Sequence, residues 1–446
     1  MFTVQGDVIG GFCDGISRRN FLKVGAMGLG FGGVGLPDML RLQASQDNPK
    51  PSYKAVINLH LEGGPPQMDT FDMKPDSSLE LRGEFSPIRT KVPGTHICEL
   101  LPNLAKLTDK FTIIRSVIGN VNKHNYDTTQ LGYPGLGLPK PAMRSIGGAP
   151  SIGGVISKLL GGRDGMPAYV WDKVGGSQEE VQDGWLGPRY APFDPKVSPK
   201  SFEATIPEER LHDRIGLLGM IDKVRRTIDN SKNMEVADQY TQEAVNMVLS
   251  GKVAEAMDLT KEPESSRAKY VDGIPTQWRG QTERLMLARR LVEAGARYVS
   301  LNWGGYLGFD SHDNNYPRMR SILPPFDMSL SALITDLYER GLDKDVLVVA
   351  WGEFGRTPVV NDKAGRDHWP QVQSALVIGG GLKMGQVIGV TDHLAGEPIE
   401  RPVHVHEVIA TIYDHCGINT QETQLVDPNG RPRYLLDYLK PIQELG

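Results

Sequence analysis

The apolar run Val346–Ala350 constrains the fold more than any other stretch of this chain. It is short and continuously apolar, which predicts a strand covered on both faces, because a strand with one wet face alternates apolar and polar residues. Such strands belong to parallel sheets that carry helices on both sides. The run ends in a loop that contains Glu353 and Arg356, and a second loop, Gly365–Trp369, contains His368. In such sheets, ligands bind beyond the carboxyl ends of the strands, so these loops are candidate walls of a site.

Strands and helices alternate along most of the remaining sequence. Further apolar segments of strand length occupy Tyr53–Leu61, Phe111–Val117, Pro167–Trp171, Tyr298–Asn302 and Ser374–Ile378. Helical periodicity is found in Leu100–Leu107, Ser151–Leu160, Gln281–Ala294, Leu323–Arg340 and Val403–Cys416. This alternation predicts an α/β domain over residues 50–440, built on a doubly wound, mostly parallel sheet. Amphipathic patterns in Glu208–Ile228 and Glu235–Leu249 predict a mainly helical insertion at about 205–275.

The N-terminus reads as an export signal. Ser17–Lys23 is a twin-arginine sequence, SRRNFLK, and a glycine-diluted apolar stretch, Val24–Leu36, follows it. That stretch is short for a membrane span and fits a signal peptide. We therefore expect residues 1–48 to be a signal and linker, and the protein to be exported by the twin-arginine machinery to the periplasm or cell envelope. The alternative is a chance arginine pair before a buried helix. Leu42–Ala44 is a mediocre cleavage site, so an uncleaved membrane tether stays open.

Charge and cysteine content exclude some classes of function. The net charge is −5 with a pI of about 6.1, and the charges are well mixed, so no basic surface for nucleic acid is expected. The cysteines, Cys13, Cys98 and Cys416, form neither a metal-binding spacing nor a disulfide framework. Cys98 and Cys416 could pair in an oxidising compartment, but free buried thiols are favoured. Contact with a membrane is expected only through the signal segment.

Acidic and imidazole side chains follow several of the predicted strands. They are Asp69 and Asp72 after the first strand, His124 after the second, Asp310 and His312 after Tyr298–Asn302, Glu353 and Arg356 after Val346–Ala350, and His368 before the last strand. Carboxylate and imidazole groups are the ligands that zinc and related divalent ions prefer. Their shared placement in these loops predicts a metal site at one edge of the sheet.

Taken singly, each of these residues has a structural explanation. Asp69 or Asp72 could cap a helix or a turn, and His312 could bond to loop backbone. Glu353 and Arg356 could form a local ion pair. His404 and His406 have a metal-like spacing, but a helix begins beside them, so capping or packing is an equal alternative.

Four separated motifs carry a family resemblance. GGPPQMDTFD, GFDSHDNN, WGEFGRTP and GRDHW, in this order after a twin-arginine signal, resemble the DUF1501 family of exported bacterial proteins, which is plentiful in planctomycetes. That family is similar in fold to the alkaline phosphatase/sulfatase superfamily. The resemblance covers about residues 50–440 and implies a sheet of the alkaline phosphatase-like type.

The resemblance also implies roles for individual residues. The metal ligands would be Asp69 (with Asp72 as competitor), Asp310, His312, Glu353 and His368. Arg356, with Lys123 or His124, would stabilise the charge that develops on the anion.

Two departures stand out. Phe354 occupies the place where the superfamily usually has a histidine ligand, and no residue sits in a recognisable nucleophile motif, although Ser116, Thr128 and Thr129 lie in the right region. The Cys-x-Pro-x-Arg sequence of formylglycine sulfatases is absent.

Two hypotheses follow. The first is an exported metal-dependent hydrolase that acts on a phosphate or sulfate ester, either a small anionic molecule or a polysaccharide. It would use one or two divalent ions, zinc first, with manganese or calcium as alternatives. The second is a non-catalytic binding or assembly protein on the same fold, which the phenylalanine at position 354 and the unplaced nucleophile motivate.

Overall fold

The structure is a computed structural model, and it describes residues 53–78, 83–124, 127–131, 149–172, 184–196, 247, 250–305, 308–436 and 440–446. The predicted twin-arginine signal lies outside the described residues, as does most of the predicted helical insertion. The described end of that insertion contains two helices, α9 (Lys252–Met257) and α10 (Glu264–Val271). No helix in the described part of the chain is both long and apolar enough to cross a membrane.

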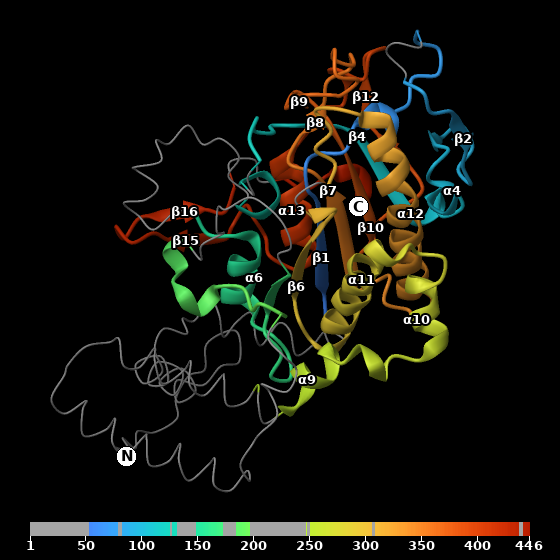
Figure 1. Cartoon of the computed structure of the whole chain (residues 1–446). Helices are drawn as coiled ribbons and strands as arrows, with labels where there is room; N and C mark the ends of the chain where they lie inside the picture. The colour runs from blue at the N-terminus through green and yellow to red at the C-terminus, as the bar shows by residue number, and fades with distance from the viewer. Residues whose placement is uncertain are drawn as a thin grey trace, which may run out of the picture. The chain divides into compact units, whose positions relative to one another are not determined.

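The central element is a sheet of eight strands within the described residues (Figure 1). Its strands are β1 (Ala55–Leu61), β4 (Phe111–Ile118), β5 (Tyr169–Asp172), β6 (Tyr298–Trp303), β7 (Val346–Trp351), β10 (Gln373–Gly379), β11 (Val387–Ile388) and β14 (Val403–His404). Their order is β11-β4-β10-β7-β1-β6-β5, with β14 also paired to β4. The remaining described strands form separate two-stranded sheets. These pair β2 (Pro87–Arg89) with β3 (His96–Cys98), β8 (Gly355–Arg356) with β9 (His368–Trp369), β12 (Val390–Thr391) with β13 (Pro398–Glu400), and β15 (Gln424–Val426) with β16 (Pro432–Tyr434).

All the sheet strands run in one direction except β10, which is antiparallel to both of its neighbours, β7 and β4. The register places the ends of the central strands level, because Leu61 lies opposite Trp303 and His60 lies opposite Trp351. The loops that follow β1, β4, β6 and β7 therefore leave the same edge of the sheet. The loop that precedes β10 arrives at that edge because β10 runs the other way. In Figure 1, β8 and β9 mark this edge at the upper end of the sheet.

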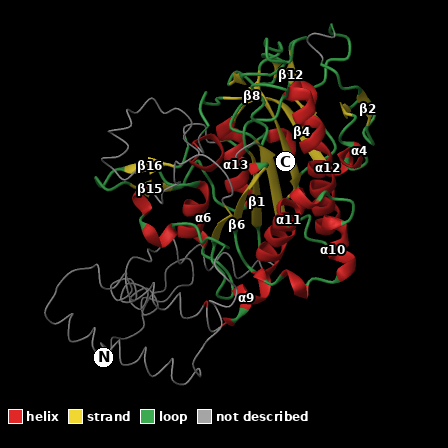
Figure 2. Cartoon of the chain, viewed as in Figure 1, coloured by secondary structure: helices red, strands yellow, loops and turns green. Residues whose placement is uncertain are grey.

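Helices cover both faces of the sheet (Figure 2). The other helices are α4 (Pro102–Ala105), α6 (Ile152–Leu160), α11 (Thr276–Ala294), α12 (Asn315–Glu339) and α13 (Val405–His415). Val56 and its neighbours on one face join a buried core with α6 and α13. Side chains alternate along a strand, so Ile57 faces the other side, where α11 packs on β1 and β6 with α12 beside it. The predicted class, a mostly parallel sheet with helices on both faces, is confirmed.

The largest difference from the predicted elements concerns α12. The sequence predicts a helix from Leu323, but the helix begins at Asn315 and carries Pro324 and Pro325 inside it. Each proline removes a backbone N–H from the helix. The helix continues through them because apolar residues before and after the prolines bury one side of it. These residues, which are fully or almost fully buried, are Met319, Ile322, Leu323, Phe326 and Leu330. Burial of that stripe outweighs the lost hydrogen bonds.

The described cysteines, Cys98 and Cys416, are buried and free.

Candidate metal centre

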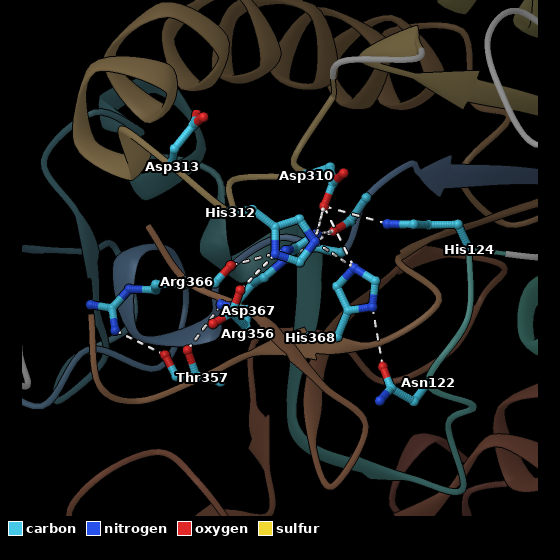
Figure 3. Close-up of polar contacts among 12 residues, drawn as sticks. Asn122, His124, Asp310, His312, Asp313, Arg356, Thr357, Arg366, Asp367 and His368 are labelled. Atoms are coloured by element: carbon cyan, nitrogen blue, oxygen red, sulfur yellow. Dashed lines mark hydrogen bonds and ion pairs between the residues drawn. The ribbon is translucent and has the colours of Figure 1, made fainter. Parts of the chain in front are cut away.

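Four side chains from three segments of the chain converge at the carboxyl edge of the sheet. His124 follows β4, Asp310 and His312 follow β6, and His368 lies in β9, ahead of the antiparallel β10. One ligand-type atom from each residue lies within 4.8 Å of all the others. Figure 3 shows the three imidazoles gathered around the Asp310 carboxylate.

The distances place a single oxygen at the centre of this group. Asp310 Oδ1 lies 3.4 Å from His124 Nε2, 3.2 Å from His312 Nε2 and 3.6 Å from His368 Nε2. The Nε2 atoms of His312 and His368 are 2.9 Å apart. Two imidazole nitrogens facing each other at this distance repel unless a proton or a cation lies between them. Three nitrogens and one carboxylate oxygen also form a donor set that zinc binds in proteins. The residues present therefore fit a divalent metal ion.

The opposite nitrogen of every imidazole is held by a hydrogen-bond acceptor. His124 Nδ1 lies 2.7 Å from Glu353 Oε1, His312 Nδ1 lies 2.6 Å from Asp367 Oδ1, and His368 Nδ1 lies 3.1 Å from Asn122 Oδ1. Such contacts favour the tautomer with the proton on Nδ1, which leaves the Nε2 lone pair free for a metal ion. Metal-binding histidines in proteins are almost always oriented in this way. The pattern repeats three times here.

Two carboxylates dominate the electrostatics. Burial opposes ionisation of Asp310, but hydrogen bonds from His124, His368 and Arg356 outweigh it and hold the pKa of Asp310 far below its usual range. Burial also opposes ionisation of Glu353, and hydrogen bonding to His124 again lowers the pKa. For His124 itself, burial acts to lower the pKa, yet the bonds to Asp310 and Glu353 raise it to about 9. The site therefore favours positive charge at its centre.

Glu353 supports His124 from behind rather than joining the four donors. Its side chain is 1% exposed, and it accepts hydrogen bonds from the Gly63 backbone N–H at 3.0 and 3.2 Å. His60 Nε2 lies 3.6 Å from its other oxygen, and burial lowers the pKa of His60, so that imidazole is neutral. His60 Nδ1 in turn lies 2.9 Å from the Thr129 hydroxyl. Glu353, which the resemblance implies as a ligand, thus orients His124, one of the four candidate ligands.

Arg356 is fully buried and braces the loop after β1. Its guanidinium donates to the Gly63, Gly64 and Arg366 carbonyls and lies 2.6 Å from Asp310 Oδ1. Gly63 has a φ of +97°, and a Cβ there would lie 2.3 Å from the Asp310 backbone nitrogen, so only glycine fits this close approach. The structure places Arg356 beneath Asp310, where it positions the carboxylate and is not open to solvent.

Asp69 lies apart from the four donors. Its carboxylate is fully buried and bonds to Arg366 at 2.8 and 3.1 Å and to the Asn315 amide at 2.8 Å. Both oxygens are therefore occupied by an internal ion pair, in contrast to the ligand role that the sequence predicts. Asp72, its predicted competitor, is also fully buried and pairs with Lys74 and Arg115. These two aspartates tie the loop after β1 to its surroundings.

Within the described residues, the hydroxyl candidates form no hydrogen bond with the four donors. Ser116 donates to the Arg401 carbonyl from the middle of β4, and Thr129 contacts His60. Thr128 is fully buried, and its hydroxyl has no hydrogen-bond partner among the residues described. Lys123 is exposed beside His124.

Phe354 packs directly on the imidazoles. Its ring is fully buried, with its centroid 4.3 Å from that of His368 and 5.2 Å from that of His124. A hydrocarbon wall therefore stands where the superfamily resemblance leads one to expect another ligand.

The sequence reasoning missed three residues of the site, namely Asn122, Asp367 and His60. Asp367 directly precedes His368 in GRDHW, which is a signal that could have been used. Asn122 follows β4 and His60 lies within β1, and neither position carried a further signal. His404 is the N-cap of α13 and forms a capping box with Glu407, which is the capping alternative considered for that histidine.

Comparison with known protein families identifies the family of this chain. The family described as "Protein of unknown function (DUF1501)" matches residues 53–445. No curated protein sequence matches the chain.

The chain is similar to several solved structures at low sequence identity. PsFucS1 sulfatase from Pseudoalteromonas sp. is 13% identical, with a TM-score of 0.36, over 92% of this chain and 74% of that one. The lipoteichoic acid synthase LtaP from Listeria monocytogenes is 11% identical, with a TM-score of 0.37, over 83% and 73%. A Mg-bound mutant of TAB5 alkaline phosphatase is 10% identical, with a TM-score of 0.36, over 82% and 99%. These likenesses carry no activity over to this chain.

Proposed function

The chain belongs to the DUF1501 family, and because the description of that family states no activity, we propose from the site itself that the protein is a metal-dependent hydrolase of phosphate or sulfate esters. The observation that carries the proposal is the convergence of three imidazole Nε2 atoms on Asp310 Oδ1, with an acceptor behind every imidazole. The ester class rests on the four sequence motifs that resemble the DUF1501 family, because that family is similar in fold to the alkaline phosphatase/sulfatase superfamily.

The proposed centre holds one ion. His124, Asp310, His312 and His368 would bind it, and the nitrogen-rich donor set favours zinc, with manganese as the alternative. Phe354 supports a single ion, because its ring fills the space beside His368 without offering a ligand. A bound divalent cation supplies Lewis-acid polarisation of an ester oxygen.

The chain's own residues prepare this chemistry by orientation. Glu353, Asp367 and Asn122 hold the Nδ1 protons, so that the three Nε2 atoms present lone pairs to one point. Arg356 holds Asp310 in place. The His312 side chain is 47% exposed, so substrate would reach the centre from this side. Within the described residues no side-chain hydroxyl is bonded to the donors, and water is therefore the proposed nucleophile.

We place the protein outside the cytoplasm. Arg18 and Arg19 in SRRNFLK support export by the twin-arginine route to the periplasm or cell envelope. Replacing both arginines with lysine should abolish export, measured by cell fractionation with a cytoplasmic marker as control. Unchanged export of the double variant would contradict this route.

Metal content and turnover test the catalytic proposal together. Elemental analysis of the purified protein should find about one zinc or manganese ion per chain, because the site offers one set of four donors. His312→Ala should lose the ion and lose turnover on 4-nitrophenyl phosphate or sulfate. His393→Ala is the matched control, since that histidine is exposed and lies outside the cluster. A folded His312→Ala protein that retains its full metal content would contradict the proposal.

A second candidate function is a non-catalytic metal-binding or assembly protein on this fold. The buried guanidinium of Arg356, which faces backbone carbonyls instead of solvent, favours it. On this reading the protein binds the ion with the same stoichiometry but turns over no ester on a phosphate and sulfate panel. Hydrolysis that disappears in His368→Ala would exclude it.

A further inference from the structure

A cavity of about 540 Å³ opens beside the proposed metal centre, and we propose that it binds a sugar unit of a glycan substrate. The proposal rests on the proposed function and names the substrate class of that same site, a sugar carrying a phosphate or sulfate ester. The cavity lies between the start of α11, the loop after β6 and the first turns of α12. Its volume is in the range of small-molecule binding sites.

The chain connects this cavity to the metal centre directly. The loop that provides Asp310 and His312 continues into Asp313 and Asn314, which line the cavity. Consecutive Cα atoms are about 3.8 Å apart, so a ligand that touches Asp313 lies within about one sugar ring of His312. Asp313 points away from the four donors in Figure 3, and the neighbouring His312 side chain is 47% exposed. One substrate can therefore span both.

An aromatic ring provides one wall. Trp278, at the start of α11, is partly exposed and lines the cavity. Its ring stacks on the fully buried Trp303, with the planes 13° apart and the centroids 6.1 Å apart, and Trp303 in turn packs on Phe326. The indole is thus held in one orientation. A pyranose ring presents a face of C–H groups, and a fixed aromatic face with its negative quadrupole is the surface that attracts such a face.

Planar polar groups provide the other walls. Gln277, Gln281 and Asn314 line the same cavity with side-chain amides. Gln281 Oε1 accepts from Arg284 Nη1 at 2.9 Å, which fixes the orientation of the amide. Amides both donate and accept, so they can pair with the neighbouring hydroxyls of a sugar. An aromatic face together with several amides suits a polyhydroxylated ring better than a lipid chain.

A charged pair completes the cavity. Asp313 Oδ1 lies 3.9 Å from Arg318 Nη2, which is beyond hydrogen-bonding distance, and both side chains line the cavity. The separation leaves room for a sugar hydroxyl between the two groups, where it would donate to the Asp313 carboxylate and accept from the Arg318 guanidinium. Asn314 adopts a left-handed backbone conformation, with φ of +46°, which turns the chain from the metal centre into α12.

Sugar binding can be measured without turnover. The purified full-length protein would be titrated with neutral β-linked glucan hexasaccharides and sulfated galactan hexasaccharides, with tryptophan fluorescence and calorimetry as readouts. The wild type should bind at least one of them with millimolar or better affinity. Trp278→Ala should weaken that binding by about tenfold or more, and Trp278→Phe, which keeps an aromatic face, by no more than about threefold.

Controls keep the result interpretable. Trp185→Ala removes another partly exposed indole outside the cavity and should leave the affinity unchanged. If Trp278→Ala does not fold, Gln281→Ala replaces it, with the same direction of effect. No binding to any panel member, or equal affinities of Trp278→Ala and wild type, would overturn the proposal. Because the titration reads sugar and not metal, its failure is distinct from a failure of metal binding or turnover, which elemental analysis and the aryl ester assays report.

Discussion

Replacing Glu353 with glutamine should weaken metal binding by about 10- to 100-fold, which corresponds to about 1.4 to 2.7 kcal/mol. The glutamate is fully buried and accepts from His124 Nδ1 at 2.7 Å and from the Gly63 N–H at 3.0 and 3.2 Å. A carboxylate has two acceptor oxygens, whereas the amide of glutamine has one, and its NH₂ would face one of these two donors. His124 would also lose a charged hydrogen-bond partner, which is worth about 1.5 to 3 kcal/mol. The two magnitudes agree.

Competition with a chromophoric zinc chelator measures this loss, and thermal unfolding of the metal-free protein separates it from any loss of folding stability. Asp367→Asn is the matched control. Asp367 holds His312 Nδ1 at 2.6 Å in the same way, but its side chain is 53% exposed, so water can replace the lost acceptor. We expect its effect on affinity to be no more than about threefold, because exposed charge pairs contribute little. Equal effects of the two substitutions, or none for Glu353→Gln, would refute the argument from burial.

Three further substitutions probe the framework around the site. Asp69→Asn leaves the Arg366 guanidinium buried without its anion and should cost about 3 to 5 kcal/mol of unfolding free energy in a urea titration, and a loss below about 1 kcal/mol would contradict the buried ion pair. Gly63→Ala should lower the free energy of unfolding by roughly several kcal/mol, because the new Cβ would clash with the Asp310 backbone at a positive φ. A variant as stable as the wild type would contradict the 2.3 Å approach to Asp310. Burial lowers the pKa of His415 to about 4. Between about pH 6.5 and 4, His415 is therefore protonated in the unfolded chain but neutral in the folded chain. The free energy of unfolding should fall by about 3 kcal/mol as the pH is lowered to 4. His415→Gln should lose this pH dependence, which unfolding curves at several pH values would detect.

Much of the fold could be predicted from periodicity. The predicted strand Val346–Ala350 corresponds to β7, which extends one residue further, to Trp351. The predicted strand Tyr298–Asn302 corresponds to β6, which also extends one residue further, to Trp303. These segments are apolar throughout because both faces are covered, so the signal is strong. The start of α12 was not predictable in the same way. Pro324 and Pro325 indicate a boundary locally, whereas packing of the helix side decides that it continues through them.

The candidate site was predictable as a set of loops but not as a set of contacts. Asp310, His312 and His368 meet as expected, because they leave strands at one edge. Asp69 and Glu353 also leave strands at that edge, yet one pairs with Arg366 and the other stands behind His124. Nothing in the spacing of carboxylates along a chain tells which of them faces a common centre and which faces a buried guanidinium.

The sequence by itself determined the alternation of strands and helices, the edge at which polar loops gather, and the chemical types available there. These properties are local, since they depend on runs of a few residues. The tertiary structure alone decided the antiparallel course of β10, which brings His368 to the same edge, and the partner of each charged group. Those choices depend on which buried charges can be satisfied at once. A buried carboxylate is stable only when it pairs with a cation or an N–H group. Asp69 and Arg366 are almost three hundred positions apart in the sequence, so they can form such a pair only in the folded chain.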